Sequence, residues 1–265
     1  MSQPTIDPTA VVAEGAELGD DVEVGAFCVL GADIKIADQC RLHSHVVVTG
    51  RTSLGEGCEI FPFASIGHIP QDQKFQGEES QLVIGPHCTI REHVTMNPGT
   101  TGGGGVTRVG AHGLFMVGSH VAHDCQVGDR VILANNATLA GHCVIGDHVI
   151  LGGLSAVHQF VRIGPHAFIG GMSGVENDVI PFGVAIGDRA SLSDLNIVGL
   201  KRRGFSREEI HSLRNAYRLL FSNEGTLKER LIDVEAMFAD DAGVRQIIDF
   251  INERSDRALC MPKSS

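Results

Sequence analysis

A histidine and a glycine at fixed places in a regular repeat are the first sign of chemistry in this chain. The stretch 121–144, VAHDCQ VGDRVI LANNAT LAGHCV, divides into four lines of six residues, with His123 in the first line and Gly141 in the last. If residues 18 apart stack about 4.8 Å from one another, His123 lies above Gly141. An imidazole can remove a proton from a hydroxyl near neutral pH, and a glycine N–H can donate to an oxyanion. The pair indicates acyl transfer without a covalent enzyme intermediate; the alternative is a corner histidine with no catalytic role.

The 13 histidines of the chain are not equivalent in this repeat. We number the six places of each line from its large apolar residue. The fourth place lies at an outward corner, and we interpret most residues there as ordinary surface residues. It holds seven of the histidines: His45, His87, His93, His112, His142, His148 and His166. His123 is at the third place, also on the outward corner, His120 is at the sixth and His158 at the second. Stacking also puts Gly141 above Gln159 and Asp124 above His142.

The repeat itself extends through most of the chain. Every sixth residue from Ile6, with two breaks, gives 27 first places, and 24 of these are Ile, Leu or Val, the exceptions being Met96, Phe115 and Pro181. The residue four positions later is nearly always small. A period of six with two inward places excludes an α-helix, so these short strands must wind as a solenoid whose coils contain three lines. The pattern resembles the hexapeptide-repeat family, which implies a left-handed parallel β-helix over residues 1–190.

Six of the seven cysteines fall on the small inward place. They are Cys28, Cys40, Cys58, Cys88, Cys125 and Cys143. We interpret them as small hydrophobic residues. The chain contains no CxxC pair, so we predict neither a disulfide framework nor a metal site from them.

Two segments interrupt the repeat, and a different pattern follows it. Residues 67–83 and 101–108 are polar or glycine-rich and should project as loops; we interpret the glycine run in the second as flexible backbone only. After Pro181 the hexad fails and the spacing becomes helical, with helices expected near 194–203, 206–222, 226–239 and 242–254. Ser206 with Glu209 and Thr226 with Glu229 are predicted capping boxes. We therefore predict an α-helical domain over 191–265.

Charge and hydropathy narrow the class of protein. The chain of 265 residues has a net charge of −11, which argues against nucleic-acid binding. No apolar run approaches the roughly 20 residues of a membrane span, and we expect a cytoplasmic protein. Residues 201–218 are nevertheless basic, which suggests an anionic partner. We expect the cluster Lys201, Arg202 and Arg203 to face solvent and to contribute little to the fold.

Several segments together are similar to one family. QDQKF, GSHVAHDC, LANNATLAGH, AVHQF, GGMSGV and GLKRRGFSRE resemble, in this order, the UDP-N-acetylglucosamine 3-O-acyltransferases, which begin lipid A synthesis. The resemblance covers nearly the whole chain. It implies that a sugar 3-hydroxyl attacks the thioester of a 3-hydroxyacyl chain carried on the phosphopantetheine of acyl carrier protein, with no other cofactor and no metal. It also implies a homotrimer with sites between subunits, in which the basic segment meets the acidic carrier.

The resemblance assigns roles residue by residue. It makes His123 the general base and the Gly141 amide the oxyanion donor. It places Asp72 and Lys74 at the glucosamine and its phosphate, and Gly171 at the floor of the acyl pocket, where a glycine implies a deep pocket. The other matching positions are His120, His142, His158 and Gln159 in the pocket, and Asn196, Arg202 and Arg203 near the nucleotide or the carrier.

The chain departs from the family pattern at three places, and two rivals follow from the residues. Asn97 and Pro98 stand where a His-Arg pair is expected, Val198 replaces an acidic residue, and Arg189 replaces a histidine. The acceptor could therefore carry a 3-amino group.

One rival is another hexapeptide acyltransferase, acting on an amine or transferring acetyl. The other is a zinc hydratase of the γ-carbonic-anhydrase kind, with His120, His123 and His142 around the metal.

Overall fold

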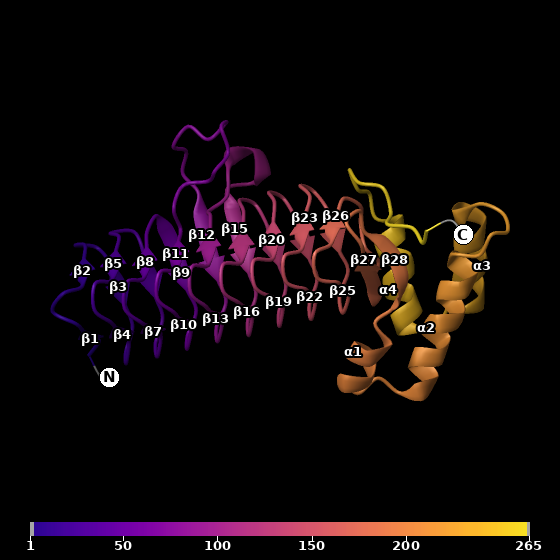
Figure 1. Cartoon of the computed structure of the whole chain (residues 1–265), viewed down its shortest axis with the longest axis horizontal. Helices are drawn as coiled ribbons and strands as arrows, with labels where there is room; N and C mark the ends of the chain where they lie inside the picture. The colour runs from indigo at the N-terminus through magenta and orange to yellow at the C-terminus, as the bar shows by residue number, and fades with distance from the viewer. Residues whose placement is uncertain (1–2, 264–265) are drawn as a thin grey trace.

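A computed structural model describes residues 3–263. Within these residues the chain winds through three parallel sheets that form a β-helix, and a helical domain stands at its C-terminal end (Figure 1). The predicted fold class is thus confirmed. No helix in residues 3–263 is long and apolar enough to cross a bilayer.

Up to β26 each sheet contains every third strand, and β27 and β28 then extend sheet 1. Sheet 1 contains β1 (Thr5–Ile6), β4 (Glu23–Val24), β7 (Arg41–Leu42), β10 (Glu59–Ile60), β13 (Thr89–Ile90), β16 (Leu114–Phe115), β19 (Ile132–Leu133), β22 (Ile150–Leu151), β25 (Phe168–Ile169), β27 (Gly183–Ile186) and β28 (Ser191–Leu195). Sheet 2 contains β2 (Val11–Val12), β5 (Val29–Leu30), β8 (Val47–Val48), β11 (Ser65–Ile66), β14 (Thr95–Met96), β17 (His120–Val121), β20 (Thr138–Leu139), β23 (Ala156–Val157) and β26 (Gly174–Val175). Sheet 3 contains β3 (Glu17–Leu18), β6 (Lys35–Ile36), β9 (Arg51–Leu54), β12 (Gln81–Ile84), β15 (Val106–Val109), β18 (Gln126–Val127), β21 (Val144–Ile145) and β24 (Arg162–Ile163).

The two inward places of the hexad build the core. In most two-residue strands the second residue, at the first place of the hexad, is buried while the residue before it is at least partly exposed. The six cysteines at the small inward place are also buried. The seventh, Cys260, is buried as well, and none of the seven forms a disulfide. Their thiols also donate across the coil, as from Cys28 Sγ to the carbonyl of His43 at 2.9 Å and from Cys143 Sγ to that of His158 at 3.2 Å. A small side chain with one weak donor suits this place.

The three edges where the chain turns from one sheet to the next are called corner 1–2, corner 2–3 and corner 3–1. Both interruptions of the repeat lie at corner 2–3, between β11 and β12 and between β14 and β15, and they project together (Figure 1). Both loops are shorter than predicted, because β12 begins at Gln81 and β15 at Val106. The glycine run is not merely flexible backbone, since Thr101–Gly103 forms a 3-10 turn, η1.

The C-terminal domain contains α1 (Ile197–Arg202), α2 (Arg207–Leu220), α3 (Leu227–Met237) and α4 (Ala242–Asn252). Both predicted capping boxes are present, at Ser206 and Thr226. The first helix starts later than predicted because β28 pairs antiparallel with β27 before Asn196 caps α1. We keep residue 190 as a proposed boundary. Arg162 of β24 joins the two parts: its guanidinium lies over the ring of Phe250 in α4 and pairs with Glu253 at 2.7 Å.

Candidate active site

The turn at each corner explains why so many histidines occupy the fourth place. All seven fourth-place histidines have φ between 58° and 63°. Few side chains tolerate this left-handed conformation, and His, Asp and Asn are enriched among those that do. Most of these histidines are therefore explained by the left-handed backbone conformation that the turn requires. Asp124, with φ of 61°, occupies the same place directly after His123.

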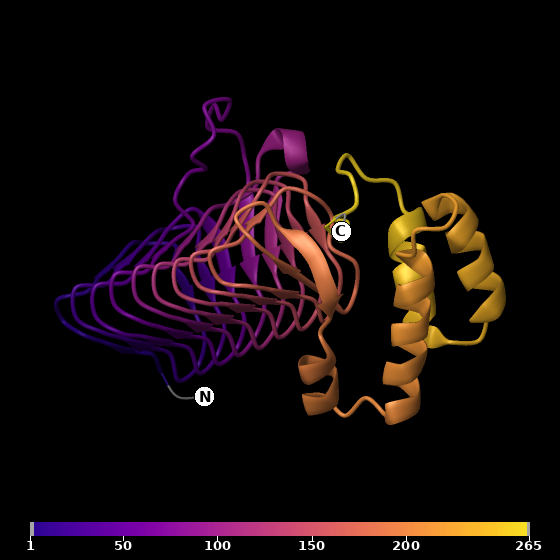
Figure 2. The same ribbon diagram turned by 45° about the vertical axis from the view of Figure 1, so that its right-hand side comes forward.

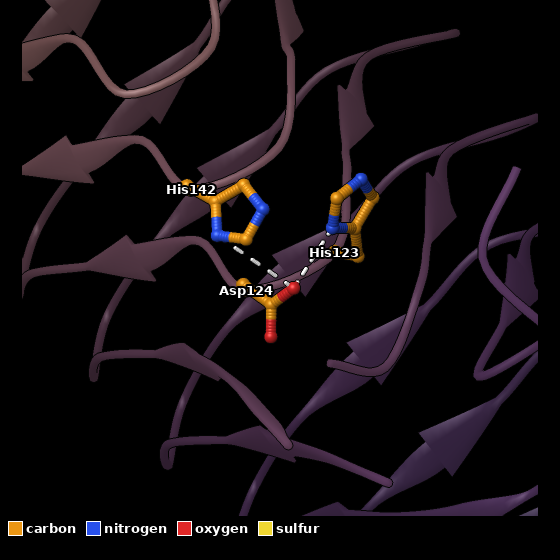
Figure 3. Close-up of side chains that lie close together, drawn as sticks. All are labelled: His123, Asp124 and His142. Carbon is orange, nitrogen blue, oxygen red and sulfur yellow. Dashed lines mark hydrogen bonds and ion pairs between the residues drawn. The ribbon is translucent and has the colours of Figure 1, made fainter. Parts of the chain in front are cut away.

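His123 is held by its neighbour rather than exposed as a corner residue. The sequence placed it on the outward surface, but His123 is 7% exposed and Asp124 is 4% exposed. His123 Nδ1 lies 2.8 Å from Asp124 Oδ2, and His142 Nδ1 lies 3.8 Å from the same oxygen (Figure 3). Because a carboxylate can only accept, the proton of a neutral His123 ring is on Nδ1. Its Nε2, which points away from Asp124, is then free to accept a proton.

The second projecting loop fixes the carboxylate of Asp124. Thr100 donates twice, from its backbone N to Oδ1 at 2.8 Å and from its hydroxyl to Oδ2 at 2.6 Å. The loop approaches so closely that a Cβ on Gly103 would lie 2.0 Å from Asp124 Cγ. Thr107 also binds the Asp124 amide at 2.7 Å. The glycine-rich loop therefore packs onto the residue that orients His123.

Gly141 lies against the His123 ring, as the stacking predicted. The register pairs Val121 with Leu139, which puts His123 over Gly141. A Cβ on Gly141 would lie 2.4 Å from Cε1 and 2.6 Å from Nε2 of the ring. Among residues 3–263, no acceptor receives the Gly141 N–H. A proton acceptor and a free backbone donor thus lie side by side.

Several of the other predicted residues surround this pair at corner 2–3. His120 Nδ1 is 2.7 Å from Thr95 Oγ1, and burial lowers the pKa of His120. Burial also lowers the pKa of His142, although Asp124 opposes the shift, and its ring stacks on Phe160 at 4.5 Å.

Asp72 and Lys74 belong to the first projecting loop and act on His142 electrostatically. The charge of Asp72 raises the pKa of His142, and that of Lys74 lowers it. The loop is shaped locally by a bond from the Lys74 amide to Asp72 Oδ1 at 3.0 Å. His158 and Gln159 lie one coil beyond Ala140 and Gly141, also at corner 2–3.

The remaining predicted residues lie elsewhere in the chain. Gly171 is exposed at corner 1–2, after β25. Asn196 and Arg202 line a cavity of about 590 Å³ beside sheet 1, together with Arg203. Asn196 Nδ2 donates to the carbonyl of His166 at corner 3–1, at 2.9 Å.

Arg203 corrects one expectation. It is half-buried, burial lowers its pKa, and its Nη2 donates to the carbonyl of His148 at 2.8 Å. The cluster is therefore not uniformly solvent-facing, and Arg203 contributes to the attachment of α1.

The three departures from the family pattern are also located. Asn97 is buried and donates from Nδ2 to the carbonyl of His68 at 2.9 Å, at the base of the first loop. Val198 is 62% exposed and lines the 590 Å³ cavity. The exposed Arg189 lies 3.7 Å from Glu176.

The structure groups different potential metal ligands from those of the zinc alternative. Ligand atoms of His123, Asp124 and His142 lie within 4.8 Å of one another. Asp124 thus takes the place predicted for His120, which binds Thr95 instead. Sequence reasoning missed both Asp124 and Thr100 as site residues. An acid directly after the candidate base was a usable signal, whereas nothing in the sequence marked Thr100.

Comparisons with known proteins cover nearly the whole chain. Residues 178–260 match the family model "Udp N-acetylglucosamine O-acyltransferase; Domain 2", and residues 15–50 match the bacterial transferase hexapeptide model. Two relatives are named acyl-[acyl-carrier-protein]--UDP-N-acetylglucosamine O-acyltransferase. The protein from Caulobacter vibrioides is 56% identical over 98% of this chain and 98% of its own length. The protein from Azorhizobium caulinodans is 56% identical over 99% of this chain and 97% of its own length. The structure of the UDP-N-acetylglucosamine acyltransferase of Francisella novicida superimposes with a TM-score of 0.95 at 35% identity, covering 98% of this chain and 95% of the other.

Proposed function

From the premise that the chain belongs to the acyl-[acyl-carrier-protein]--UDP-N-acetylglucosamine O-acyltransferase family, we propose how its own residues perform the transfer. The enzyme moves an acyl chain from acyl carrier protein to UDP-N-acetylglucosamine in lipid A biosynthesis. We assign the base to His123 and the oxyanion donor to the Gly141 N–H. The acyl group is a (R)-3-hydroxyacyl chain, and the acceptor is the oxygen at the glucosamine 3-position.

The proposed reaction needs one base and one donor. His123 Nε2 removes the proton of the 3-hydroxyl as its oxygen attacks the thioester carbonyl. The carbonyl oxygen becomes an oxyanion and accepts from the Gly141 N–H. Collapse of this intermediate breaks the C–S bond, and the proton on Nε2 passes to the departing pantetheine thiolate. Asp124 stabilises the transient imidazolium through Nδ1, as its 2.8 Å hydrogen bond allows.

One observation carries this assignment. The bond between His123 Nδ1 and Asp124 leaves Nε2 as the acceptor, beside a glycine N–H without a partner among the described residues. His123→Ala should lower kcat by at least about 100-fold, because it removes the proposed general base. His93→Ala is the matched control, since His93 is a fourth-place histidine away from corner 2–3. Near-normal turnover of the His123 variant, with an unchanged circular dichroism spectrum, would disprove the assignment.

We propose that the sites lie between the chains of a homotrimer, and the placement of the binding residues supports sites shared between chains. Asp72, Lys74 and His123 belong to corner 2–3, whereas α1 with Arg202 lies on the opposite side of the β-helix (Figures 1 and 2). One chain cannot bring both groups to one substrate. Mixing His123→Ala chains with Arg202→Ala chains and allowing subunits to exchange should restore activity, because some sites then contain both native residues. Failure of exchanged oligomers to regain activity would contradict the shared site.

The basic segment supports a carrier-binding role. No carboxylate lies within 4.0 Å of a basic nitrogen of residues 201–218 in the described part of the chain. Lys201, Arg207, His211 and Arg214 line a further cavity of about 410 Å³ between α1 and α2. Unpaired cations of this kind suit an acidic partner, and we propose that acyl carrier protein docks here. Raising the salt concentration should increase the KM for the carrier.

A further inference from the structure

The last residues of the chain return to the corner that holds the candidate site. After α4 the backbone runs back along the final coils, where Asp178 N donates to the carbonyl of Ala258 at 2.8 Å and Cys260 N donates to that of Asp178 at 2.7 Å (Figure 2). These two bonds fix the segment on either side of Leu259, which forms an isolated bridge with Asp178. Arg257 is thereby brought to corner 2–3.

The side chain of Arg257 contacts two of the predicted pocket residues. Its Nη2 lies 2.6 Å from His158 Nδ1, and its Nε donates to the carbonyl of Gln159 at 2.8 Å. A guanidinium has only donors, so His158 Nδ1 is the acceptor in this 2.6 Å contact; the carbonyl of Gln159 lies 3.4 Å from the same nitrogen, too far to compete for it as a donor. The ring proton of His158 then resides on Nε2. A free imidazole populates both tautomers, and this contact selects one of them.

We propose that Arg257 is a positioning residue that fixes His158 as an Nε2–H donor at the candidate site. His158 is exposed, so this donor is accessible to a bound molecule. Its chemistry suits an acceptor oxygen, which the pantetheine arm offers in its amide carbonyls and phosphate and the UDP-sugar offers in its diphosphate. The inference rests on the proposed function only for its kinetic consequence. The tautomer itself is a property of the free protein.

The direct test reads the tautomer by nuclear magnetic resonance. Full-length protein labelled with ¹⁵N in histidine gives distinct shifts for protonated and unprotonated ring nitrogens, and the His158 signals are assigned by their loss in His158→Gln. In the native protein Nδ1 should appear unprotonated and Nε2 protonated. In Arg257→Met both signals should move toward the averaged values of a mixed population. Arg254→Met is the control for charge, because Arg254 is exposed and lies in the same segment.

Kinetics test the functional half and identify the ligand. Arg257→Met should lower kcat/KM by a few-fold, because only part of the His158 population then presents Nε2–H to the ligand. A rise in the KM for acyl carrier protein identifies the pantetheine arm, and a rise in the KM for the UDP-sugar identifies the diphosphate. Arg257→Lys should not restore the native values, because an ammonium cannot reproduce the two-donor geometry.

The alternative is that Arg257 only anchors the C-terminal segment. Glu253→Gln tests this, since it weakens the Arg162 ion pair at the start of the segment without touching His158. Equal loss of kcat/KM in Glu253→Gln and Arg257→Met would overturn the inference, as would native His158 shifts in Arg257→Met. The shifts are measured without turnover, so they remain informative even if His123→Ala shows that the proposed mechanism is wrong.

Discussion

Adding a single methyl group at Gly141 tests the catalytic geometry most sharply. In Gly141→Ala the new Cβ would lie 2.4 Å from Cε1, 2.6 Å from Nε2 and 3.0 Å from Nδ1 of His123. Carbon atoms in contact normally stay about 3.5 Å apart, so the ring must retreat by about 1 Å. The backbone N–H of residue 141 is retained. The substitution therefore displaces the proposed base while leaving the proposed oxyanion donor in place.

The magnitude follows from how firmly the ring is held. The His123 side chain is only 9% exposed and its Nδ1 is bonded to Asp124, so a retreat stretches that bond or rotates the ring. A displacement of about 1 Å at a reacting group can cost about 100-fold in rate. Overfilling a packed place costs about 1–3 kcal/mol of folding free energy. We expect kcat to fall about 100-fold and the melting temperature to fall by only a few degrees.

The assay is steady-state acyl transfer from acyl carrier protein, together with thermal unfolding. Gly31→Ala is the control, because a Cβ there would meet Thr49 Oγ1 at 3.2 Å and the residue, although also at corner 2–3, lies between β5 and β6, several coils away from Gly141. That variant should keep native kcat. A Gly141→Ala enzyme with kcat within about threefold of native would show that His123 can move without consequence. The assignment of His123 as a rigidly positioned base would then be wrong.

Four further predictions follow from other contacts. Thr100→Val removes a 2.6 Å bond to the carboxylate that orients the base and should lower kcat about tenfold, whereas Thr100→Ser should keep it. Burial lowers the pKa of His166 to about 4, below the ordinary value of about 6.5. Between these two pH values the folded state binds fewer protons than the unfolded state, so the free energy of unfolding should fall as the pH drops from about 6.5 to 4. In His166→Phe the melting temperature should fall less over the same pH range. Arg203→Ala should lower the melting temperature, because it removes the bond to the carbonyl of His148. Arg202→Ala should leave the melting temperature unchanged and raise the KM for a substrate. A lower melting temperature in Arg202→Ala but not in Arg203→Ala would contradict the contacts of Arg203. Gly171→Met should shift the kcat/KM preference toward shorter acyl chains, and an unchanged preference would exclude that residue as the length determinant.

The fold could be predicted because its determinants are local and periodic. Each hexad specifies its own strand and turn, and the register between coils is set by counting in units of 18 along most of the chain, as the pairing of Val121 with Leu139 illustrates. Stacking arguments therefore located Gly141 beneath His123 without any long-range information. The capping boxes at Ser206 and Thr226 were equally local, and both are present.

The parts that could not be predicted depend on segments outside the periodic pattern. Thr100 reaches Asp124 from a loop whose path no spacing rule defines, and Arg257 reaches His158 from 99 residues away. His123 is buried partly because that loop covers Asp124, so its exposure was misjudged. Arg203 was misjudged for a similar reason, because α1 folds back onto the carbonyl of His148 at corner 3–1. In each case the repeat predicts the scaffold, whereas contacts from a non-repeating segment determine burial.

The same geometry limits what one chain can assemble. Residues at one corner approach each other by stacking, as His123, Gly141 and Gln159 do, but the core filled by pairs such as Ile145 and Cys143 separates the three corners. Loops can extend the reach of a corner, and both projecting loops extend corner 2–3 alone. The acyl-floor candidate Gly171 at corner 1–2 and the residues of α1 near corner 3–1 can approach His123 only across a contact between chains. This supports our proposal that the β-helix of one chain supplies the base and its donor, and that neighbouring subunits supply the surfaces that measure the acyl chain and hold the nucleotide.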